Sequence, residues 1–560
     1  MRQLTYFSLI LCLAGCSRIE PQFQNSQAID NLRPEVQPAA EAVMQKYFGT
    51  PTQMNAWEKL PIRHSGAVGN VTEPIFNDAD QVIGVQVDST TLDQAWTITE
   101  GERLAWLEDK PVSAAGPLTV KSLTPAADSL HELMFSRPLE GSLPTVSEGA
   151  ELRFVISPGE LLISGRQLYA EHCLHCHGVS GDGAGPTAQY LNPLPRDYRQ
   201  GKFKFTSTGG GMPPTRDDLA NIITQGIPGT YMPSFKLLEE REKGAIVEYV
   251  RWLSMRGRSE IQLSEQTDFY SDASVDQRLD EVAATIPETD SRKKDLQTEQ
   301  SKYEKAKEGL DPGSEQLAKL ETSHRSARYA LLSAEFDASL FKDLDDVLSE
   351  MVDATVGGLW REVEVPGEDG APSPALVFPM TPRPEPTAES IAKGKELFLG
   401  AKGSCFNCHG PAGLGDGPQT RQVAEPKDGL IFSEPGLRDD WGHLIQPRNL
   451  RSGIFRGGRR PIDLYRRLSV GIKGTPMAGF STLVRKADEG EAADDDGMTD
   501  ADLWHLVNYV LSMPHEAVVA GEEISMPEIV TPPAATGETE APVEAAPAEA
   551  AAVEAAATNS

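Results

Sequence analysis

Cysteine is scarce in this chain, long apolar runs are almost absent, and basic residues are outnumbered by acidic ones. Six cysteines occur among 560 residues, and each one that remains after export has a use in the motifs below, which excludes a disulfide framework. Beyond the first 16 residues, no stretch approaches the roughly 20 apolar residues that span a bilayer. The formal net charge of −31 makes nucleic acid a poor partner, because its phosphates would be repelled.

The first 16 residues read as a secretory signal. A basic residue and an apolar stretch lead into Leu13, Ala14, Gly15 and Cys16, a small-residue cleavage pattern. This pattern resembles a bacterial lipobox, which implies that Cys16 is lipidated and begins the mature chain; a plain signal peptide cut elsewhere is the alternative. Cys12 lies in the removed segment. We therefore expect a periplasmic, extracytoplasmic protein that is anchored to a membrane by acyl chains on Cys16.

The sequence Cys-x-x-Cys-His occurs twice, 232 residues apart (409 minus 177). Each copy is followed by three glycines at the same spacing, which we name the glycine ladder: Gly181, Gly183 and Gly185 in the first copy, and Gly413, Gly415 and Gly417 in the second. Two cysteines at this spacing can bond both vinyl groups of one porphyrin, and the next histidine then lies under the iron, which is the attachment signature of c-type haem. A structural zinc site usually needs a second Cys or His pair, and no cysteine remains to supply one. The sequence predicts two covalently attached haem c groups, held by Cys173, Cys176, His177, Cys405, Cys408 and His409.

The internal repeat extends beyond these motifs. Each copy has a preceding helix with glycine and an aromatic residue four positions apart, then a Pro-Arg pair, a Gly-x-x-Gly-Thr-x-Met segment and a closing helix. This order resembles the class I cytochrome c family, over about residues 160–258 and 388–514. The resemblance implies a mainly α fold with two class I cytochrome c domains.

The resemblance also implies the second axial ligand of each iron. Met232 and Met477 occupy the same place in the repeat, between Gly-Thr and Phe, and a thioether ligand raises the reduction potential relative to a second histidine. Core packing is the ordinary role of a single methionine. Met212, Met498 and His443 are less well placed competitors, and none of them has a partner in the repeat.

A Pro-Arg pair follows each haem motif, as Pro195-Arg196 and as Pro447-Arg448. The prolines resemble the family proline whose carbonyl accepts the Nδ1 proton of the haem histidine, a contact that fixes the ring. Arg196 and Arg448 are placed to pair with haem propionates, which suits a planar guanidinium. A solvated surface arginine is the alternative for each.

Residues 441–480 hold eight basic side chains and one acid, Asp463. Two interpretations stay open. The cluster either neutralises haem propionates and forms a solvated face, or it is a docking patch that steers an acidic partner towards the haem edge. The basic residues are Arg448, Arg451, Arg456, Arg459, Arg460, Arg466, Arg467 and Lys473.

The rest of the chain divides by composition. The alternating run Val82–Val87 predicts short strands. Residues 261–360 carry 22 acidic and 11 basic side chains, and their apolar spacing predicts a helical hairpin; a disordered acidic spacer is the alternative. The predicted organisation is signal peptide 1–16, polar tether 17–35, partly β N-terminal extension 36–155, first cytochrome domain 160–258, helical spacer 265–356, Pro-rich linker 357–387, second cytochrome domain 388–514 and disordered Ala/Glu/Pro tail 515–560.

Electron transfer is the function that these features predict. Two haems with both axial positions filled by side chains have no open site for a substrate. We expect an electron carrier, or an electron-transfer subunit, that acts between redox proteins of the membrane or periplasm, such as a respiratory quinol-oxidising complex or an oxidase. A dihaem cytochrome c peroxidase-like enzyme, which would keep one iron five-coordinate, is the alternative, and haem-based sensing is a third class.

Overall fold

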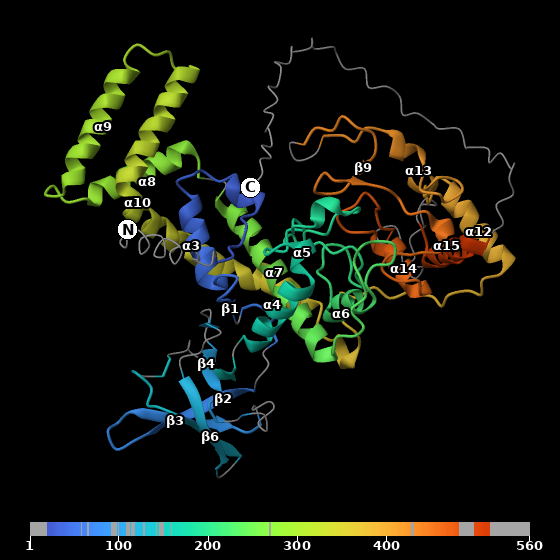
Figure 1. Cartoon of the computed structure of the whole chain (residues 1–560), viewed down its shortest axis with the longest axis horizontal. Coiled ribbons are helices and arrows are strands. Elements are labelled where there is room, and N and C mark those ends of the chain that lie inside the picture. The colour runs from blue at the N-terminus through green and yellow to red at the C-terminus, as the bar shows by residue number, and fades with distance from the viewer. Residues whose placement is uncertain are drawn as a thin grey trace, which may run out of the picture. The chain divides into compact units, whose positions relative to one another are not determined.

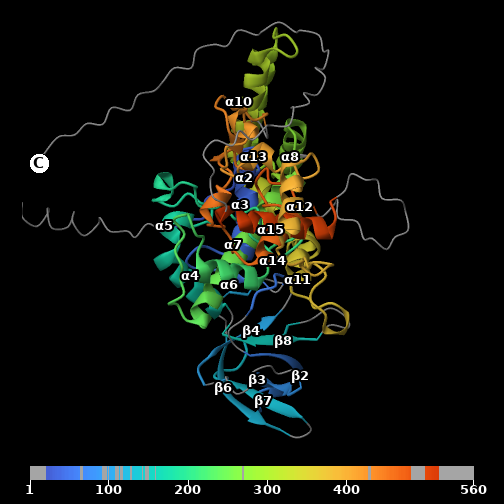
Figure 2. The ribbon, with the colours of Figure 1, turned by 90° about the vertical axis from the view of Figure 1, so that its right-hand side faces the viewer.

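The computed structural model (Figures 1 and 2) describes residues 20–480 and 498–515, apart from short internal gaps. All the described residues belong to one unit, Met1–Glu516. The predicted lipidation site Cys16 and nearly all of the predicted tail lie outside the described residues. The internal gaps are 58, 64–66, 91–97, 99, 108–111, 114–117, 127–128, 142, 145–150, 158, 268–269 and 427–429.

The first repeat folds around two crossing helices. Its helices are α4 (Glu160–His172), α5 (Leu174–His177), α6 (Arg216–Gln225) and α7 (Glu240–Thr267), with a 3-10 turn, η2 (Ala188–Tyr190). α4 crosses α7 at Gly165, where a Cβ would collide with the carbonyl of Ala245. Beside the crossing, the rings of Tyr169 and Tyr249 lie edge to face with their centroids 5.1 Å apart. The predicted boundary at residue 258 falls inside α7.

The second repeat has the same crossing. Its elements are α12 (Ala388–Leu399), α13 (Phe406–His409), η5 (Pro418–Arg421), β9 (Leu437–Arg438), β10 (Leu444–Ile445), η6 (Leu450–Ser452), α14 (Pro461–Val470), α15 (Asp500–Ser512) and η7 (Met513–His515). α12 and α15 lie side by side (Figure 1) and meet at Gly394, where a Cβ would collide with the carbonyl of His505. Phe398 and Tyr509 repeat the edge-to-face pair, with centroids 5.5 Å apart.

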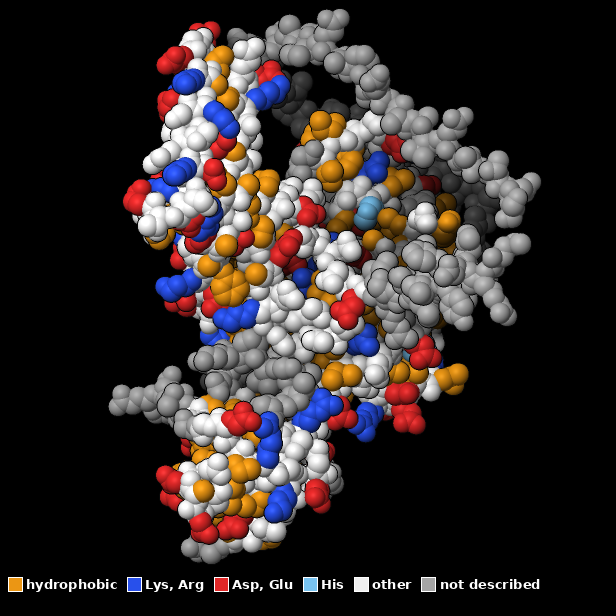
Figure 3. Space-filling view, turned by 60° about the vertical axis from the view of Figure 1, so that its left-hand side comes forward, with side chains coloured by type: hydrophobic (Ala, Val, Ile, Leu, Met, Phe, Trp, Pro, Cys, Tyr) orange, Lys and Arg blue, Asp and Glu red, His pale blue; other side chains and the backbone are white. Residues whose placement is uncertain are grey.

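A helical region lies between the two repeats in the sequence. It comprises α8 (Asp272–Thr285), α9 (Ser291–Lys307), α10 (Glu315–Val352), a π-helical turn η3 (Asp353–Gly357) and α11 (Gly358–Glu362). α9 and α10 form the hairpin, and α8 is a further helix packed on α10. The turn between α9 and α10 contains Gly309 and Gly313, both with positive φ. On the face shown in Figure 3, basic and acidic side chains intermingle over the hairpin. Within α9, Lys302 forms an ion pair with Glu299 (2.6 Å).

The apolar stripe of α10 explains why this region is ordered. Leucine, phenylalanine and valine recur every four residues from Leu332 to Val352 and are buried. They pack with α7 and with the N-terminal helices α2 (Gln27–Asp30) and α3 (Gln37–Phe48) into one core. Residues 20–35 therefore pack on the protein, and the prediction of a polar tether is wrong there, because Ile29 is buried and the Ser26 N–H donates to Glu260 (2.5 Å).

The β-containing segment is a small closed barrel. Its antiparallel strands run in the order β2-β3-β7-β6-β4-β8, and side chains such as Val85, Leu104 and Phe154 fill its interior. The predicted extension 36–155 is thus divided, with α3 in the helical core and the strands in the barrel. The barrel strands are β2 (Val68–Phe76), β3 (Val82–Asp88), β4 (Arg103–Leu107), β6 (Leu118–Pro125), β7 (Leu130–Phe135) and β8 (Arg153–Ile156), and the separate pair is β1 (Asn55–Ala56) with β5 (Val112–Ser113).

The Pro-rich linker 357–387 is bonded to both repeats. The Val377 N–H donates to the carbonyl of Ser207 in the first repeat (2.8 Å), and the Val377 carbonyl accepts from Arg466 of α14 (3.2 Å). Farther along, the Trp504 indole donates to the carbonyl of Thr381 (2.9 Å). The linker also contains a 3-10 turn, η4 (Glu368–Gly370). Across the described part of the chain, every helix is too short or too polar to cross a membrane.

Candidate haem sites

Each Cys-x-x-Cys-His motif folds as one helical turn, α5 in the first repeat and α13 in the second. The N–H of His177 donates to the carbonyl of Cys173, and that of His409 donates to Cys405, both at 2.9 Å. The turn places both cysteines and the histidine of one motif close together, as attachment to a single porphyrin requires. Among the described residues, none of the four motif cysteines forms a disulfide.

The glycine ladder wraps each motif in the same way. The N–H of Gly183 donates to the carbonyl of His177 (3.0 Å), and that of Gly415 donates to His409 (2.8 Å). Both glycines have positive φ, which other residues adopt only with strain. The two repeats therefore share their backbone hydrogen bonds as well as their sequence spacing.

The second nitrogen of each haem histidine faces a backbone carbonyl. His177 Nδ1 lies 3.3 Å from the carbonyl oxygen of Arg196, and His409 Nδ1 lies 3.1 Å from that of Arg448. The prediction that the carbonyls of Pro195 and Pro447 accept these protons is therefore wrong. The two proline carbonyls instead face the glycine ladder, at Gly183 and Gly415.

This contact fixes the tautomer. A carbonyl only accepts, so Nδ1 carries the proton and Nε2 presents its lone pair for a metal. Burial lowers the pKa of His177 and of His409, which keeps both rings neutral. Burial also raises the pKa of the Cys173 and Cys405 thiols to about 12.

The two candidate axial methionines lie in matching turns. In the first repeat, the N–H of Ile227 donates to the carbonyl of Met232 (3.1 Å), and the Met232 N–H contacts the Thr230 hydroxyl (3.2 Å). In the second repeat, the N–H of Ile472 donates to Met477 (3.0 Å), whose own N–H contacts the Thr475 hydroxyl (3.3 Å). The two sites thus have equivalent positions in the repeat, and ligation by both methionines stays a prediction.

The competing residues have other surroundings. Met498 is fully buried in the apolar core of the second repeat. The carbonyl of Met212 accepts from Lys473 (2.6 Å). The His443 ring is 47% exposed and lies 3.7 Å from Asp439.

Arg196 has the environment of an anion ligand. All three of its guanidinium nitrogens are buried without a hydrogen-bond partner among the described residues. Its guanidinium carbon lies 4.0 Å from the ring centroid of Trp441, and burial lowers its pKa to about 10. Such donors require an acceptor, and the carboxylates of a haem fit. The surface alternative is therefore wrong for Arg196, whereas Arg448 donates to the carbonyl of Ile454 (3.0 Å) near the surface.

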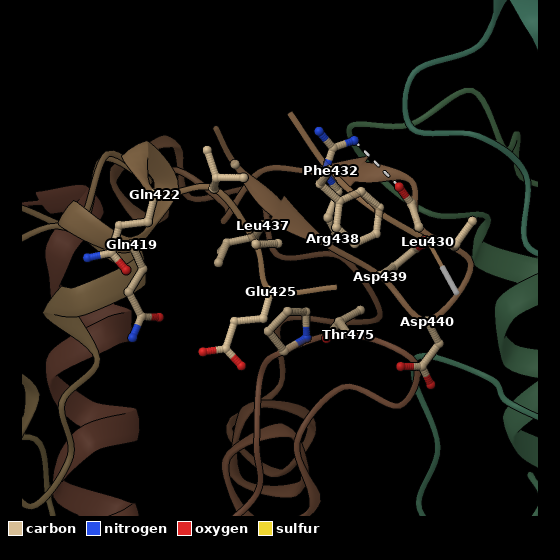
Figure 4. A pocket seen from close by; sticks show the side chains of 15 residues that line it. Gln419, Gln422, Glu425, Leu430, Phe432, Leu437, Arg438, Asp439, Asp440 and Thr475 are labelled. Atoms are coloured by element: carbon tan, nitrogen blue, oxygen red, sulfur yellow. Dashed lines mark hydrogen bonds between the residues drawn. The ribbon is translucent and has the colours of Figure 1, made fainter. Parts of the chain in front are cut away.

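A cavity of about 420 Å³ lies beside the second motif (Figure 4). One wall is Gln419, whose side-chain oxygen accepts from the Cys408 thiol (2.9 Å); another is the turn just before Met477. The cavity therefore lies between a haem-attaching cysteine and the candidate axial ligand, where a porphyrin is expected. Its lining includes Leu430, Phe432, Leu437, Thr475 and Pro476.

Most of this lining comes from a segment that is 20 residues longer (29 minus 9) than its counterpart in the first repeat. Pro418 and Pro447 are 29 positions apart (447 minus 418), whereas the equivalent Pro186 and Pro195 are 9 apart (195 minus 186). We name residues 419–446 the insertion. It carries β9, β10 and Trp441. The unequal spacing was visible in the sequence, but nothing in it indicated that Trp441 would contact Arg196.

Side chains of the basic cluster in the second repeat form hydrogen bonds with other parts of the same chain. Lys473 donates to the hydroxyl of Thr208 (3.1 Å) and the carbonyl of Met212 (2.6 Å), both in the first repeat. Arg456 donates to the carbonyl of Gly229 (3.2 Å). These contacts favour neither of the two predicted roles, because the side chains hold the two repeats together.

The contact between the repeats is reciprocal. Gly229 lies in the Met232 turn, and a Cβ on it would be 2.7 Å from Nη2 of Arg448 in the second repeat. Gly474 occupies the same place in the Met477 turn, and a Cβ on it would be 2.9 Å from Nη1 of Arg196 in the first repeat. The turn that carries the candidate methionine of one repeat thus faces an arginine of the other repeat. That arginine is the residue whose carbonyl contacts the haem-motif histidine.

Comparison with known proteins agrees with the repeat. Residues 161–250 match the family described as cytochrome C oxidase, cbb3-type, subunit III, and residues 391–514 match the family described as Cytochrome c. No curated protein matches the chain significantly. Among solved structures, the chain is similar to one from the Kuenenia stuttgartiensis reducing HAO-like protein complex, at 21% identity over 64% of this chain and 98% of that chain, with a TM-score of 0.36.

Both family matches contain a Cys-x-x-Cys-His motif with its glycine ladder. Cytochrome c domains attach haem c covalently and transfer electrons. The chain is therefore a multi-domain c-type cytochrome.

Proposed function

We propose that this protein is a dihaem electron-transfer cytochrome, with one haem c in each of two class I domains and a His–Met pair on each iron. The observation that carries the proposal is the reciprocal contact between the two repeats. The Met232 turn and the Met477 turn each abut the other domain, so that the two haem sites are neighbours within one chain. Electrons arriving at one site can then continue to the other without a second encounter.

At each haem site, different side chains would bind the iron and orient its ligands. Haem iron, when bound, supplies a one-electron redox centre. His177 and His409 would offer Nε2 to the iron because their Nδ1 protons are held by carbonyls, and Met232 and Met477 would supply the second ligand of each iron. The thioether favours the reduced state and raises the potential. With these side chains as ligands, neither iron would have an open position for peroxide, and the sites would serve electron transfer.

We also propose that Cys16 is lipidated and that the protein works outside the cytoplasm on redox proteins of a respiratory membrane. The described chain begins at Glu20 and is already held to the first domain a few residues later. The Gln24 N–H contacts the hydroxyl of Ser180 (2.6 Å), and Arg256 stacks on Phe23 (4.2 Å). An acyl chain on Cys16 would therefore hold the first haem domain close to the bilayer. The family matched by that domain is named for an oxidase subunit, which supports a respiratory role.

Pulsed partial reduction tests the proposed relay between haems. We expect whichever haem is reduced initially to pass its electron to the other haem of the same chain. The rate of this phase should not depend on protein concentration, because the transfer is intramolecular. A redistribution rate that rises in proportion to protein concentration would show that the haems of one chain do not exchange electrons directly.

A further inference from the structure

A group of buried donors without acceptors lies where the two cytochrome domains meet. Arg196 contributes Nε, Nη1 and Nη2, and Trp441 contributes its indole Nε1; none of the four has a hydrogen-bond partner in the described part of the chain. Arg196 belongs to the first domain and Trp441 to the insertion of the second. Burying an unpaired donor is costly, so four of them in one contact indicate an acceptor that the polypeptide does not supply.

The acidic residues nearby are already engaged. Asp439 accepts from the backbone N–H of Trp441 (3.1 Å) and of His443 (3.0 Å). Asp440 accepts from Lys202 (2.6 Å). Asp197 accepts from Arg199 at two of its nitrogens (2.9 and 3.1 Å). These carboxylates attract Arg196 through space, but none of them provides its missing hydrogen bonds.

The position of the donors shows which anion fits. The carbonyl of Arg196 is the group that faces His177, so its side chain leaves the loop next to the first haem motif. A Cβ on Gly474 would lie 2.6 Å from the Trp441 ring and 2.9 Å from Arg196, so the same donors also touch the turn that carries Met477. A carboxylate at the edge of the first domain's haem would reach this group, and a guanidinium with an indole N–H suits a carboxylate.

We propose that Arg196 and Trp441 form a single carboxylate site across the domain boundary, and that it takes a propionate of the haem attached to Cys173 and Cys176. The inference rests on the proposed dihaem function. Trp441 is thus a positioning residue of the second domain that acts on the haem of the first. The guanidinium neutralises the propionate and thereby disfavours the oxidised, more positive iron. The potential of the first haem therefore depends on the docked state of the second domain.

The test is a potentiometric titration of Trp441→Phe, which keeps the ring that stacks on Arg196 and removes only the N–H. It is made in the intact chain with both haems attached. We expect a downward shift of the first haem's potential, and a larger downward shift in Arg196→Gln. Arg196→Lys, which keeps the charge, should lie between Arg196→Gln and the parent chain.

The matched control is Trp252→Phe. The indole of Trp252 already donates to the carbonyl of Asn55 (3.1 Å) in the helical core, so this change should leave both potentials where they are. If Trp441→Phe and Arg196→Gln keep the parent potentials while haem content and visible spectra are unchanged, the shared site does not exist. That outcome differs from a failure of the dihaem proposal, which would show as fewer than two haems in the parent chain.

Added acetate separates a haem propionate from an exchangeable anion. A propionate is held by covalent attachment of its haem, so the potentials of the parent chain should not respond to acetate. A titratable shift with acetate, absent in Arg196→Gln, would mean that the site binds free carboxylates and would overturn the assignment.

Discussion

Arg448 of the second cytochrome domain packs its guanidinium on Gly229 of the first, so closely that a Cβ there would be 2.7 Å from Nη2. Arg196 repeats this relationship in reverse with Gly474. Two copies of one fold thus meet through equivalent loops, in the manner of a two-fold homodimer built into one chain. The loops are the ones that contact the haem-motif histidine and carry the candidate axial methionine, so docking of the domains involves the same loops as the proposed electron transfer.

Gly229→Ala should weaken this contact. Gly229 has a φ of +73°, which costs an L-residue about 1–2 kcal/mol, and the new methyl group would meet Arg448. We expect the free energy of unfolding to fall by about that amount or more. Gly210→Ala is the control, because Gly210 lies in open space with ordinary φ. Denaturant titration of both variants measures the change in the free energy of unfolding. An equal, small change for the two variants would contradict a tight interface at Gly229.

Met232→Ala and Met477→Ala should each lower the potential of one haem and leave the other close to its original value. Loss of the thioether removes a ligand that favours the reduced iron. The expected drop is on the order of 0.1 V, within the ~0.8 V that axial ligands span. Potentiometric titration measures it, and mass spectrometry should show that both haems remain attached. If both variants kept the titration curve of the parent chain, the assignment of Met232 and Met477 as iron ligands would be wrong.

Cys176→Ala and Cys408→Ala should each cost the protein one stably attached haem. Each variant loses one of the two thioether bonds that a Cys-x-x-Cys-His motif makes. Denaturing mass spectrometry should give the mass of the chain with a single haem in either variant and with two in the parent. A parent chain with one haem, or a variant that keeps two, would contradict one haem per motif.

Asp500 predicts how stability depends on pH. Burial alone would raise its pKa, but hydrogen bonds from Thr381, Tyr465 and the backbone of Met380 outweigh burial and hold the pKa below its usual value. A lowered folded-state pKa stabilises the fold above the unfolded pKa of about 3.9, and the contribution is lost as pH falls through the folded value.

Asp500→Asn should therefore lower stability near neutral pH by about 1–3 kcal/mol and flatten the decline of stability below pH ~4. Urea denaturation from pH 7 downwards measures both effects. Asp346→Asn, at an exposed position of α10, should change neither. If Asp500→Asn and the parent lose stability in parallel on acidification, the carboxylate is not ionised in the way proposed.

Cys16→Ser should release the protein from membranes. Acyl chains on Cys16 would be the membrane attachment in the proposed function. Fractionation of cells that express the parent and the variant should move the protein from the membrane pellet to the soluble fraction. Retention of the variant in the pellet would show that something other than Cys16 anchors the chain.

The sequence predicted those parts of the fold that repeat. The Cys-x-x-Cys-His spacing, the ladder through Gly183 and Gly415, and the crossing glycines Gly165 and Gly394 are local or strictly periodic signals. At its spacing, each of these signals indicates one local structure, and each occurs in both copies of the repeat. The positions of Met232 and Met477 could be aligned for the same reason.

The parts that were missed depend on contacts between distant segments. Ile29 is apolar in a polar stretch, and its burial depends on a core that helices distant in the sequence form. The alternation at Val82–Val87 predicts strands but not the closure of six strands into a barrel. Which carbonyl faces His177 depends on the course of the loop, so the carbonyl of Arg196 stands where the resemblance implied that of Pro195. Trp441 lies in an insertion without a counterpart, and no periodicity could connect it with Arg196.

The central claim is that both irons are six-coordinate electron-transfer centres. The most direct test is the spin state of the intact, oxidised protein by electron paramagnetic resonance, together with exposure of the reduced protein to carbon monoxide. The account predicts two low-spin irons and no carbon monoxide adduct. A high-spin signal from either iron, or ready binding of carbon monoxide, would contradict it and place an open catalytic site in one of the two domains.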